Sequence, residues 1–355
     1  MTTNMTNKEA LLAAIIQHPE EDTPRMVYAD LLDEIGGEPN VAQAEFIRKQ
    51  IDLEKMPADM PEAQEMSLRA ADLLKKHGRQ WLSGLCLRIE QPRFRRGFLE
   101  SASVSAGGFI RYGERLFRSA PIRAVAITDI GNCISDIARC RALRHLTSLR
   151  LGEEDRLKFY IDPLFDSPYL VSLQRLAVGS SVILGRIALG ASSTFPSLRV
   201  LDLDGGRFEV AEIMALVTGP AIPSLRALNL STNQLTDEDI RVLVSSPLLS
   251  GIRQLGLDSN EITDIGAIML AETVSLGSLR YLDVSCNMIG EDGLQALAAR
   301  REHGLDTLIT RFNNFVDQET WAERGWLPTP PYKPGWVGDV PNLCDADPNP
   351  SVSIP

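Results

Sequence analysis

The chain has 355 residues, and its 47 acidic side chains outnumber its 36 lysines and arginines to give a net charge of −11. This surplus argues against a general affinity for nucleic-acid phosphates or anionic membranes, so we expect a protein partner and no nucleic acid or membrane. The five cysteines are odd in number and form no Cys-x-x-Cys pair, which indicates reduced thiols, no structural zinc and a cytoplasmic location. No apolar run approaches the ~20 residues that a membrane-spanning helix requires.

Residues 1–84 carry helical patterns and no internal repeat, so we expect a small all-α domain there. Apolar residues recur at helical spacing, and capping residues, proline and glycine mark the helix ends. We predict four helices. The first begins at a capping-box pattern in residues 6–9, and the second runs from Thr23 to Gly36. The third covers residues 41–55, and the fourth runs from Pro61 to Gly78.

A family resemblance covers about the first 55 residues. It rests on the string His-Pro-Glu-Glu-Asp-Thr-Pro-Arg-Met-Val-Tyr-Ala-Asp-Leu-Leu-Asp-Glu at residues 18–34 and on Ala-Glu-Phe-Ile-Arg at residues 44–48. The pattern resembles the bacterial repeat-companion domain, which commonly precedes leucine-rich or other repeats. Two positions depart from the family, since Leu31 stands where Trp is usual and Ile35 where Arg is frequent. The resemblance implies an architecture and no activity that could be carried over.

After residue 85 the chain repeats a pattern of apolar residues. Each strong copy has leucine or another apolar residue at its first, fourth and sixth positions, and the copies start 27 residues apart at Leu198, Leu225, Ile252 and Leu279. The last three add an asparagine at the ninth position and an apolar residue two places later, which completes the pattern LxxLxLxxNxL. The asparagines are Asn233, Asn260 and Asn287. Such a fixed period predicts stacked repeats.

The second half of each copy predicts a helix. Apolar residues recur at i, i+3 and i+4, and Thr236 and Thr263 stand at the expected N-caps, each followed by Asp. Weaker copies start at Ile122, Leu146, Leu173 and Leu305, so we expect about eight units over residues 85–326. The proline-rich residues 327–355 are expected to be extended or disordered.

The inward leucines predict a curved parallel sheet with helices outside it, and the asparagines are expected to bind backbone groups in the turn after each strand. With its period of 27 residues, the array resembles the ribonuclease-inhibitor class of leucine-rich repeats. The predicted fold is therefore an α/β leucine-rich-repeat solenoid preceded by a small all-α domain.

The concave face of the sheet is the candidate binding surface, since repeat proteins use exposed strand positions for recognition. Arginines recur at the second position of the copies, and aspartates recur at the fifth and seventh positions beside one tyrosine. One interpretation is a striped surface for a protein partner, and the other is that Arg and Asp on neighbouring strands pair with each other. The residues concerned are Arg123, Arg199, Arg226, Arg253, Arg280, Asp202, Asp204, Asp258, Asp283 and Tyr281.

Two other charged clusters could be binding sites, but each also has a simpler structural explanation. Asp30, Asp33 and Glu34 share one helical face, where a solvated surface is favoured over a cation site. Seven arginines at residues 88–118 could bind nucleic acid, but an interdomain or solvated surface is favoured. They could also dock the acidic N-terminal domain, because residues 1–60 hold twelve acids against five bases.

The chain shows no sequence motif of a hydrolase, a phosphate-binding loop or a dinucleotide-binding loop. We therefore expect no enzyme, catalytic residue, metal or cofactor, but a monomeric scaffold or adaptor that binds a protein. The alternative hypothesis is an enzyme or regulator whose helical domain is catalytic, with His18, Asp22, Tyr28 and Asp30 in a shared pocket and the repeats selecting the substrate.

Overall fold

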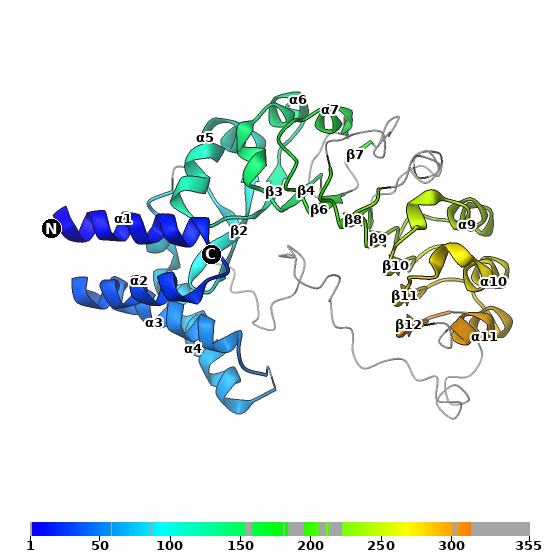
Figure 1. Cartoon of the computed structure of the whole chain (residues 1–355), viewed down its shortest axis with the longest axis horizontal. Coiled ribbons are helices and arrows are strands. Elements are labelled where there is room, and N and C mark those ends of the chain that lie inside the picture. Colours follow the sequence, from blue (N-terminus) through cyan, green and yellow to red (C-terminus); the bar gives the residue numbers. More distant parts are fainter. Residues whose placement is uncertain are drawn as a thin grey trace. The chain divides into compact units, whose positions relative to one another are not determined.

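A computed structural model describes most of the chain (Figure 1). The described residues are 2–57, 59–85, 87–152, 158–179, 182–183, 195–205, 211, 213, 222–300 and 304–313. Contacts divide them into two compact units, one that ends at Ala126 and one that begins at Ile127. The expected tail at residues 327–355 and the last part of the expected array, residues 314–326, lie outside the described residues.

The first unit begins with a helical region, as predicted. Its helices are α1 (Thr2–Gln17), α2 (Asp22–Ile35), α3 (Glu38–Leu53) and α4 (Pro61–Leu82). Three predicted helix ends are wrong. Helix α3 begins at Glu38, three residues before the predicted start. Helix α1 begins before the capping-box pattern, which therefore lies inside the helix. Helix α4 continues past Gly78, because its last turn carries Trp81, whose ring lies 5.1 Å from that of Phe46.

A β-hairpin follows the helices and shares their core. Strands β1 (Glu90–Arg95) and β2 (Phe98–Ser105) are antiparallel, and Phe98 is buried with Ile15, Leu32 and Ile47 of the helices. Helix α5 (Ala106–Ser119) comes next and is capped by the Ser105 side chain, which accepts a hydrogen bond from Gly108 N. Contacts therefore place the unit boundary later than the change of sequence pattern at residue 85.

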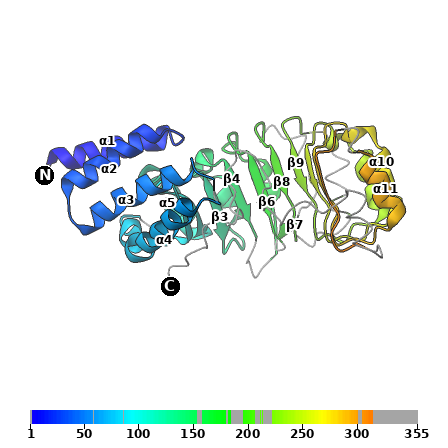
Figure 2. The ribbon, with the colours of Figure 1, turned by 90° about the horizontal axis from the view of Figure 1, so that it is seen from below.

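Strand β3 (Ala124–Thr128) carries the chain into the second unit, where the repeats form a parallel sheet. The strand order follows the chain, and Figure 2 shows β4, β6, β8 and β9 side by side. The strands are β4 (Ser148–Leu151), β6 (Arg175–Val178), β8 (Val200–Asp202), β9 (Ala227–Asn229), β10 (Gln254–Gly256), β11 (Tyr281–Asp283) and β12 (Thr307–Ile309). Every strand named here contains the third to fifth positions of a copy that the sequence identified, weak copies included.

The register confirms the predicted core. Fourth-position leucines pair across neighbouring strands, as in Leu201 with Leu228, Leu228 with Leu255 and Leu255 with Leu282. Leu228, Leu255 and Leu282 have no exposed surface. A repeating unit that aligns its leucines in this way buries a continuous apolar layer, which is the main favourable term in folding.

Helices lie on one side of strands β9 to β12 (Figure 1). They are α9 (Asp237–Val244), α10 (Asp264–Glu272) and α11 (Glu291–Ala299). Thr236 and Thr263 are the N-caps of α9 and α10, as predicted. Between strands and helices lie short elements: α6 (Ile134–Ala138), α7 (Asp162–Phe165), three 3-10 turns at Arg141–His145, Pro247–Leu249 and Val274–Leu276, and a two-stranded sheet of β5 (Phe159–Tyr160) and β7 (Val182–Ile183).

Helices α10 and α11 are each capped in part by an aspartate of the repeat before them. The Asp237 carboxylate accepts hydrogen bonds from Thr263 N (2.9 Å) and Gly266 N (3.0 Å) at the start of α10. One repeat later, Asp264 accepts in the same way from Gly290 N (2.7 Å) and Gly293 N (2.9 Å) at the start of α11. The first N–H groups of a helix have no partner within it, so these aspartates couple neighbouring repeats through their helix ends.

The repeat asparagines bind the turn backbone, which confirms their expected role. Asn260 donates to Leu257 O (2.9 Å) in its own repeat and to Leu230 O (3.1 Å) in the one before. Its Oδ1 accepts from Asn233 N (3.1 Å) and Leu235 N (2.9 Å). A buried polar side chain is tolerated here because its donor and acceptor groups all have partners.

Candidate protein-binding surface

The sheet of the second unit has two faces, and one of them lies on the side away from the buried leucines. Side chains alternate along a strand, so the third, fifth and seventh positions of each repeat share this face, which we call the open face. On strands β8 to β11 and the residues just after them, the open face carries Val200, Asp202, Asp204, Ala227, Asn229, Ser231, Gln254, Gly256, Asp258, Tyr281, Asp283 and Ser285. The four predicted aspartates and Tyr281 are all members of this group.

The second-position arginines lie at the edge of the sheet. Strands β8 to β11 begin one residue after them, and Arg199, Arg226, Arg253 and Arg280 are exposed. The Arg226 guanidinium donates through Nη1 to Pro223 O (2.9 Å) and Leu225 O (2.7 Å), and Arg280 donates to Gly304 O. At least two members of the row therefore bind loop carbonyls. Arg123, in the first unit, pairs with Glu20 at 3.0 Å.

Pairing between neighbouring strands does occur, but with an arginine that sequence reasoning missed. Arg175 Nη2 of β6 lies 2.7 Å from Asp202 Oδ2 of β8, and the Arg175 side chain is only 2% exposed. Asn229 Nδ2 also donates to Asp202, at 3.1 Å. Alignment of the weak copy that starts at Leu173 places Arg175 at its third position, which is the signal that could have found it.

The other carboxylates of the open face lie close together. Asp204 accepts from the Thr232 hydroxyl (3.0 Å), Asp258 from the Ser259 hydroxyl (3.2 Å) and Asp283 from Ser285 N (2.9 Å). Burial raises the pKa of both Asp204 and Asp283, and repulsion from Asp258 adds to each. Desolvation and like charges both disfavour the ionised form, so the middle of the face is poised to accept positive charge.

Positive charge on the open face lies toward the two ends of the strand order. Arg150 of β4 lowers the pKa of Asp204, and Arg311 after β12 lowers that of Asp283, but burial outweighs both. Among the described residues, no ion pair joins the second-position arginines to the predicted aspartates. The open face therefore carries carboxylates at its centre, and the second-position arginines form an exposed row where the strands begin.

The acidic face of α2 is paired with α3. Arg48 of α3 lies 2.7 Å from Asp30 and 2.8 Å from Asp33, in a partly exposed position. The arrangement is that of a solvated helix face with a surface ion pair. The four residues of the alternative enzyme hypothesis have separate partners. The Tyr28 ring lies 5.2 Å from that of Phe98, and Asp30 is bound to Arg48. Asp22 lies 3.0 Å from Lys55, and His18 lies 3.7 Å from Glu21.

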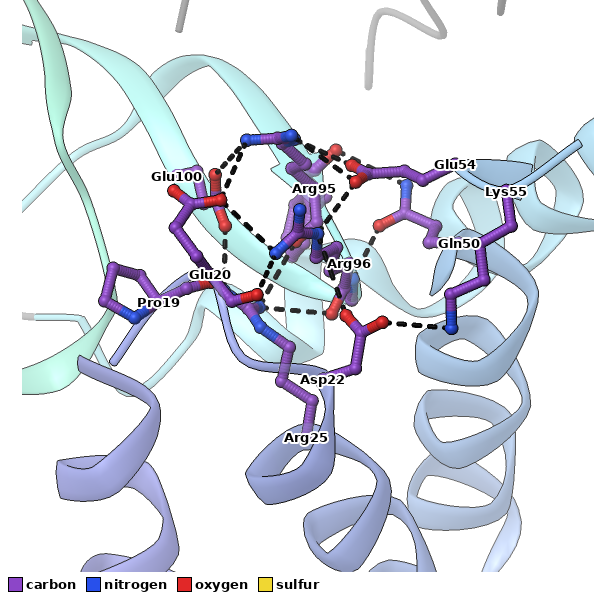
Figure 3. A network of polar contacts seen from close by, with 12 residues as sticks. Pro19, Glu20, Asp22, Arg25, Gln50, Glu54, Lys55, Arg95, Arg96 and Glu100 are labelled. Atoms are coloured by element: carbon purple, nitrogen blue, oxygen red, sulfur yellow. Dashed lines mark hydrogen bonds and ion pairs between the residues drawn. The ribbon is translucent and has the colours of Figure 1, made fainter. Parts of the chain in front are cut away.

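Two arginines of the basic segment dock the acidic helices onto the hairpin (Figure 3). The Nε atoms of Arg95 and Arg96 each lie 2.7 Å from a carboxylate oxygen of Glu54, at the end of α3. Arg96 also lies 3.4 Å from Glu20 and 3.8 Å from Asp22. This confirms the intramolecular interpretation for these two residues, whereas Arg88 pairs with its near neighbour Glu90.

Comparisons with known proteins identify the repeats. The family described as "Leucine Rich repeat" matches residues 221–244, 252–271 and 278–298. A similar solved structure is an internalin from Listeria monocytogenes, with 17% sequence identity over 64% of this chain and 71% of that chain, and a TM-score of 0.35. The curated proteins contain no match.

Within the described residues, no helix is long and apolar enough to cross a bilayer. The aligned leucines, the asparagine turns and the family match agree in the same segment of the chain. Residues 221–298 are therefore leucine-rich repeats.

Proposed function

We propose that this chain is a non-catalytic scaffold or adaptor that binds a protein on the open face of a leucine-rich-repeat solenoid. The proposal rests on the different composition of the two faces of the sheet. One face is filled by leucines such as Leu228 and Leu255, and the other presents polar side chains with carboxylates at its centre. On this face Asp204 is exposed and Gln254, Asp258 and Tyr281 are half-buried, so these side chains are the ones that can contact a partner.

The size of the face supports this proposal. A stable protein interface buries about 1,600 Å² in total, roughly half of it on each partner. Strands spaced ~4.8 Å apart provide that area over a few neighbouring repeats. Tyr281, half-buried on β11, adds an aromatic side chain of the kind that often anchors interfaces.

The proposal includes the domain organisation, the oligomeric state and the cellular location of the protein. We propose that residues 1–84 form a repeat-companion domain that packs on the β1–β2 hairpin, that the array lies within residues 85–326, and that the chain works as a monomer in the bacterial cytoplasm. The resemblance of residues 18–48 to that family supports the first part. The free thiols of Cys133 and Cys286 are compatible with a reducing compartment.

A matched pair of substitutions tests the scaffold function. Gln254 lies on the open face of β10, whereas Gln295 is exposed on α11. Proteins captured from lysate by the full chain would be identified, purified and titrated against Gln254→Trp and Gln295→Trp. We expect the indole at residue 254 to abolish binding of the purified partner and the indole at residue 295 to leave it unchanged. Equal binding by both variants would reject the open face as the site.

A further inference from the structure

Three residues stand side by side at the centre of the open face. Asp204, Ser231 and Asp258 occupy the seventh position of successive repeats. Their register is set by backbone hydrogen bonds from Gly205 N to Ser231 O (3.2 Å) and from Thr232 N to Asp258 O (2.9 Å). At a strand spacing of ~4.8 Å, the two aspartates flank the serine with ~10 Å between their backbones.

The serine between them has an unmet hydrogen bond. Ser231 is 1% exposed, and its Oγ has no hydrogen-bond partner. Its backbone N–H is already used, because it donates to Asn229 Oδ1 at 3.1 Å. A buried hydroxyl without a partner is unfavourable and calls for an explanation. A hydroxyl has two lone pairs and one proton, so once a change of χ1 turns it toward the open face it could accept a hydrogen bond from an incoming donor.

The flanking carboxylates can also accept further hydrogen bonds. Among the described residues, Asp204 and Asp258 take part in no ion pair, and each accepts one hydroxyl hydrogen bond. Asp202, in the same face, shows how such a carboxylate is satisfied, because the Arg175 guanidinium approaches it to 2.7 Å from the neighbouring strand. Arg150 is close enough to lower the pKa of Asp204, but in the described part of the chain no guanidinium forms an ion pair with Asp204 or Asp258.

We infer that Asp204, Ser231 and Asp258 form a receptor for an arginine side chain of the partner protein. The inference rests on the proposed function and names the chemistry of its central contact. A guanidinium carries several N–H donors in one plane, so it can donate to a carboxylate on one side and to the Ser231 hydroxyl while its charge offsets both aspartates.

A metal ion fits this place less well. A cation such as calcium requires six or more oxygen ligands that converge within about 2.6 Å. Within the described residues, no group of three or more His, Cys, Asp or Glu side chains is arranged to hold a metal. Two carboxylates on alternate strands, with a hydroxyl between them, match an extended planar cation better.

The probe is a fluorescein-labelled peptide of alternating arginine and glycine, titrated against the full chain at low ionic strength. Its matched control is the same peptide with citrulline, which has the shape of arginine without the charge. We expect the arginine peptide to bind and the citrulline peptide to bind at least about tenfold more weakly. Equal binding of the two peptides, or no binding of the arginine peptide, overturns the inference.

Variants then locate the contact. Asp204→Asn and Asp258→Asn should each weaken arginine-peptide binding about tenfold, and Ser231→Ala should weaken it by a smaller factor. Glu261→Gln, an equal change of charge at an exposed loop residue, should have no effect. Unchanged binding by both aspartate variants, or an equal loss in Glu261→Gln, contradicts the assignment. Ser231→Ala, which changes no charge, decides the matter if an aspartate variant fails to fold by circular dichroism.

The two proposals can fail separately. If Gln254→Trp abolishes capture of the purified partner while the aspartate variants bind the arginine peptide normally, the scaffold function stands and the arginine receptor is wrong. If peptide binding requires Asp204 and Asp258 but Gln254→Trp binds the purified partner normally, the arginine receptor stands. The open face is then not the main interface of the scaffold.

Discussion

Arg25 of α2 and Glu100 of β2 form a buried ion pair, with Arg25 Nη2 2.9 Å from Glu100 Oε1. Arg25 has no exposed surface, and the same guanidinium donates to Pro19 O (2.7 Å) and Arg96 O (3.2 Å). Figure 3 shows Arg25 and Glu100 together with the ion pairs of Arg95 and Arg96. The first helices are thereby tied to the hairpin by charged groups that water does not reach.

Removal of Arg25 should therefore destabilise the chain strongly. Arg25→Met leaves the Glu100 carboxylate buried without its cation, so we expect a loss of about 3–5 kcal/mol in the free energy of unfolding. Arg48→Met is the control, because Arg48 pairs with Asp30 in a partly exposed position, and it should cost about 1 kcal/mol or less. Urea unfolding followed by circular dichroism measures both. Similar losses would mean that the buried pair contributes no more than the surface pair.

The same pair predicts a dependence on pH. Burial raises the pKa of Glu100 from its ordinary 4.5 to about 7, although Arg25 and Arg95 oppose the shift. The folded state then binds a proton that the unfolded state releases, so the contribution of Glu100 to stability is fully present below about pH 4.5 and is lost as pH rises through about 7. Glu100→Gln removes this titration. The stability of the wild type relative to Glu100→Gln should therefore fall between pH 5 and pH 8, and a rise would show that Arg25 keeps Glu100 ionised.

Gly97 should not tolerate a side chain. It has a φ of +83° in the β1–β2 turn, and a Cβ there would lie 2.7 Å from the Ile47 Cα of α3. Gly97→Ala should cost about 3 kcal/mol, from overpacking against a backbone atom and from strained φ. Gly107, inside α5, has open space around its Cα, so Gly107→Ala should be neutral or stabilise by up to about 1 kcal/mol. Thermal unfolding compares the two alanine variants, and equal melting temperatures would exclude the close approach.

Asp237 should stabilise a helix in the next repeat. Asp237→Ala removes the hydrogen bonds from Thr263 N and Gly266 N, so we expect a loss of about 1–2 kcal/mol and faster hydrogen exchange at the start of α10. Asp292→Ala, in the first turn of α11, removes an exposed aspartate and serves as the control. Exchange that quickens only around α9, the helix that holds Asp237, would contradict coupling between repeats.

The repeat fold could be predicted from sequence because it depends on spacing. Leucines such as Leu228 and Leu255 recur with the same step as the strands, so pattern alone places them in one layer. Helix ends were harder, since α4 is extended by the contact between Trp81 and Phe46, which no local signal reports. The docking of Arg95 and Arg96 on Glu54 could be suggested from charge but not located, because it joins residues about forty positions apart.

The candidate site was found only in outline. Motif numbering placed the aspartates on the open face, but it could not show that the long side chain of Arg226 folds back onto Pro223 O and Leu225 O. The spacing of the repeats gives no sign that the Ser231 hydroxyl lacks a partner, because this is a property of burial and geometry.

The aspartates that reach across repeats constrain how this protein can be engineered. In a duplicated unit inserted after α9, the first helical N–H groups would donate to the Asp237 carboxylate, but the unit would need an aspartate at its own first helical position to accept from the unit that follows. Consensus units that carry another residue there would still align their leucines with those of the array. The first N–H groups of the following helix would then lack their hydrogen bonds to the aspartate. Graft boundaries are therefore best placed so that each donor segment keeps both the aspartate and the helix start that it serves.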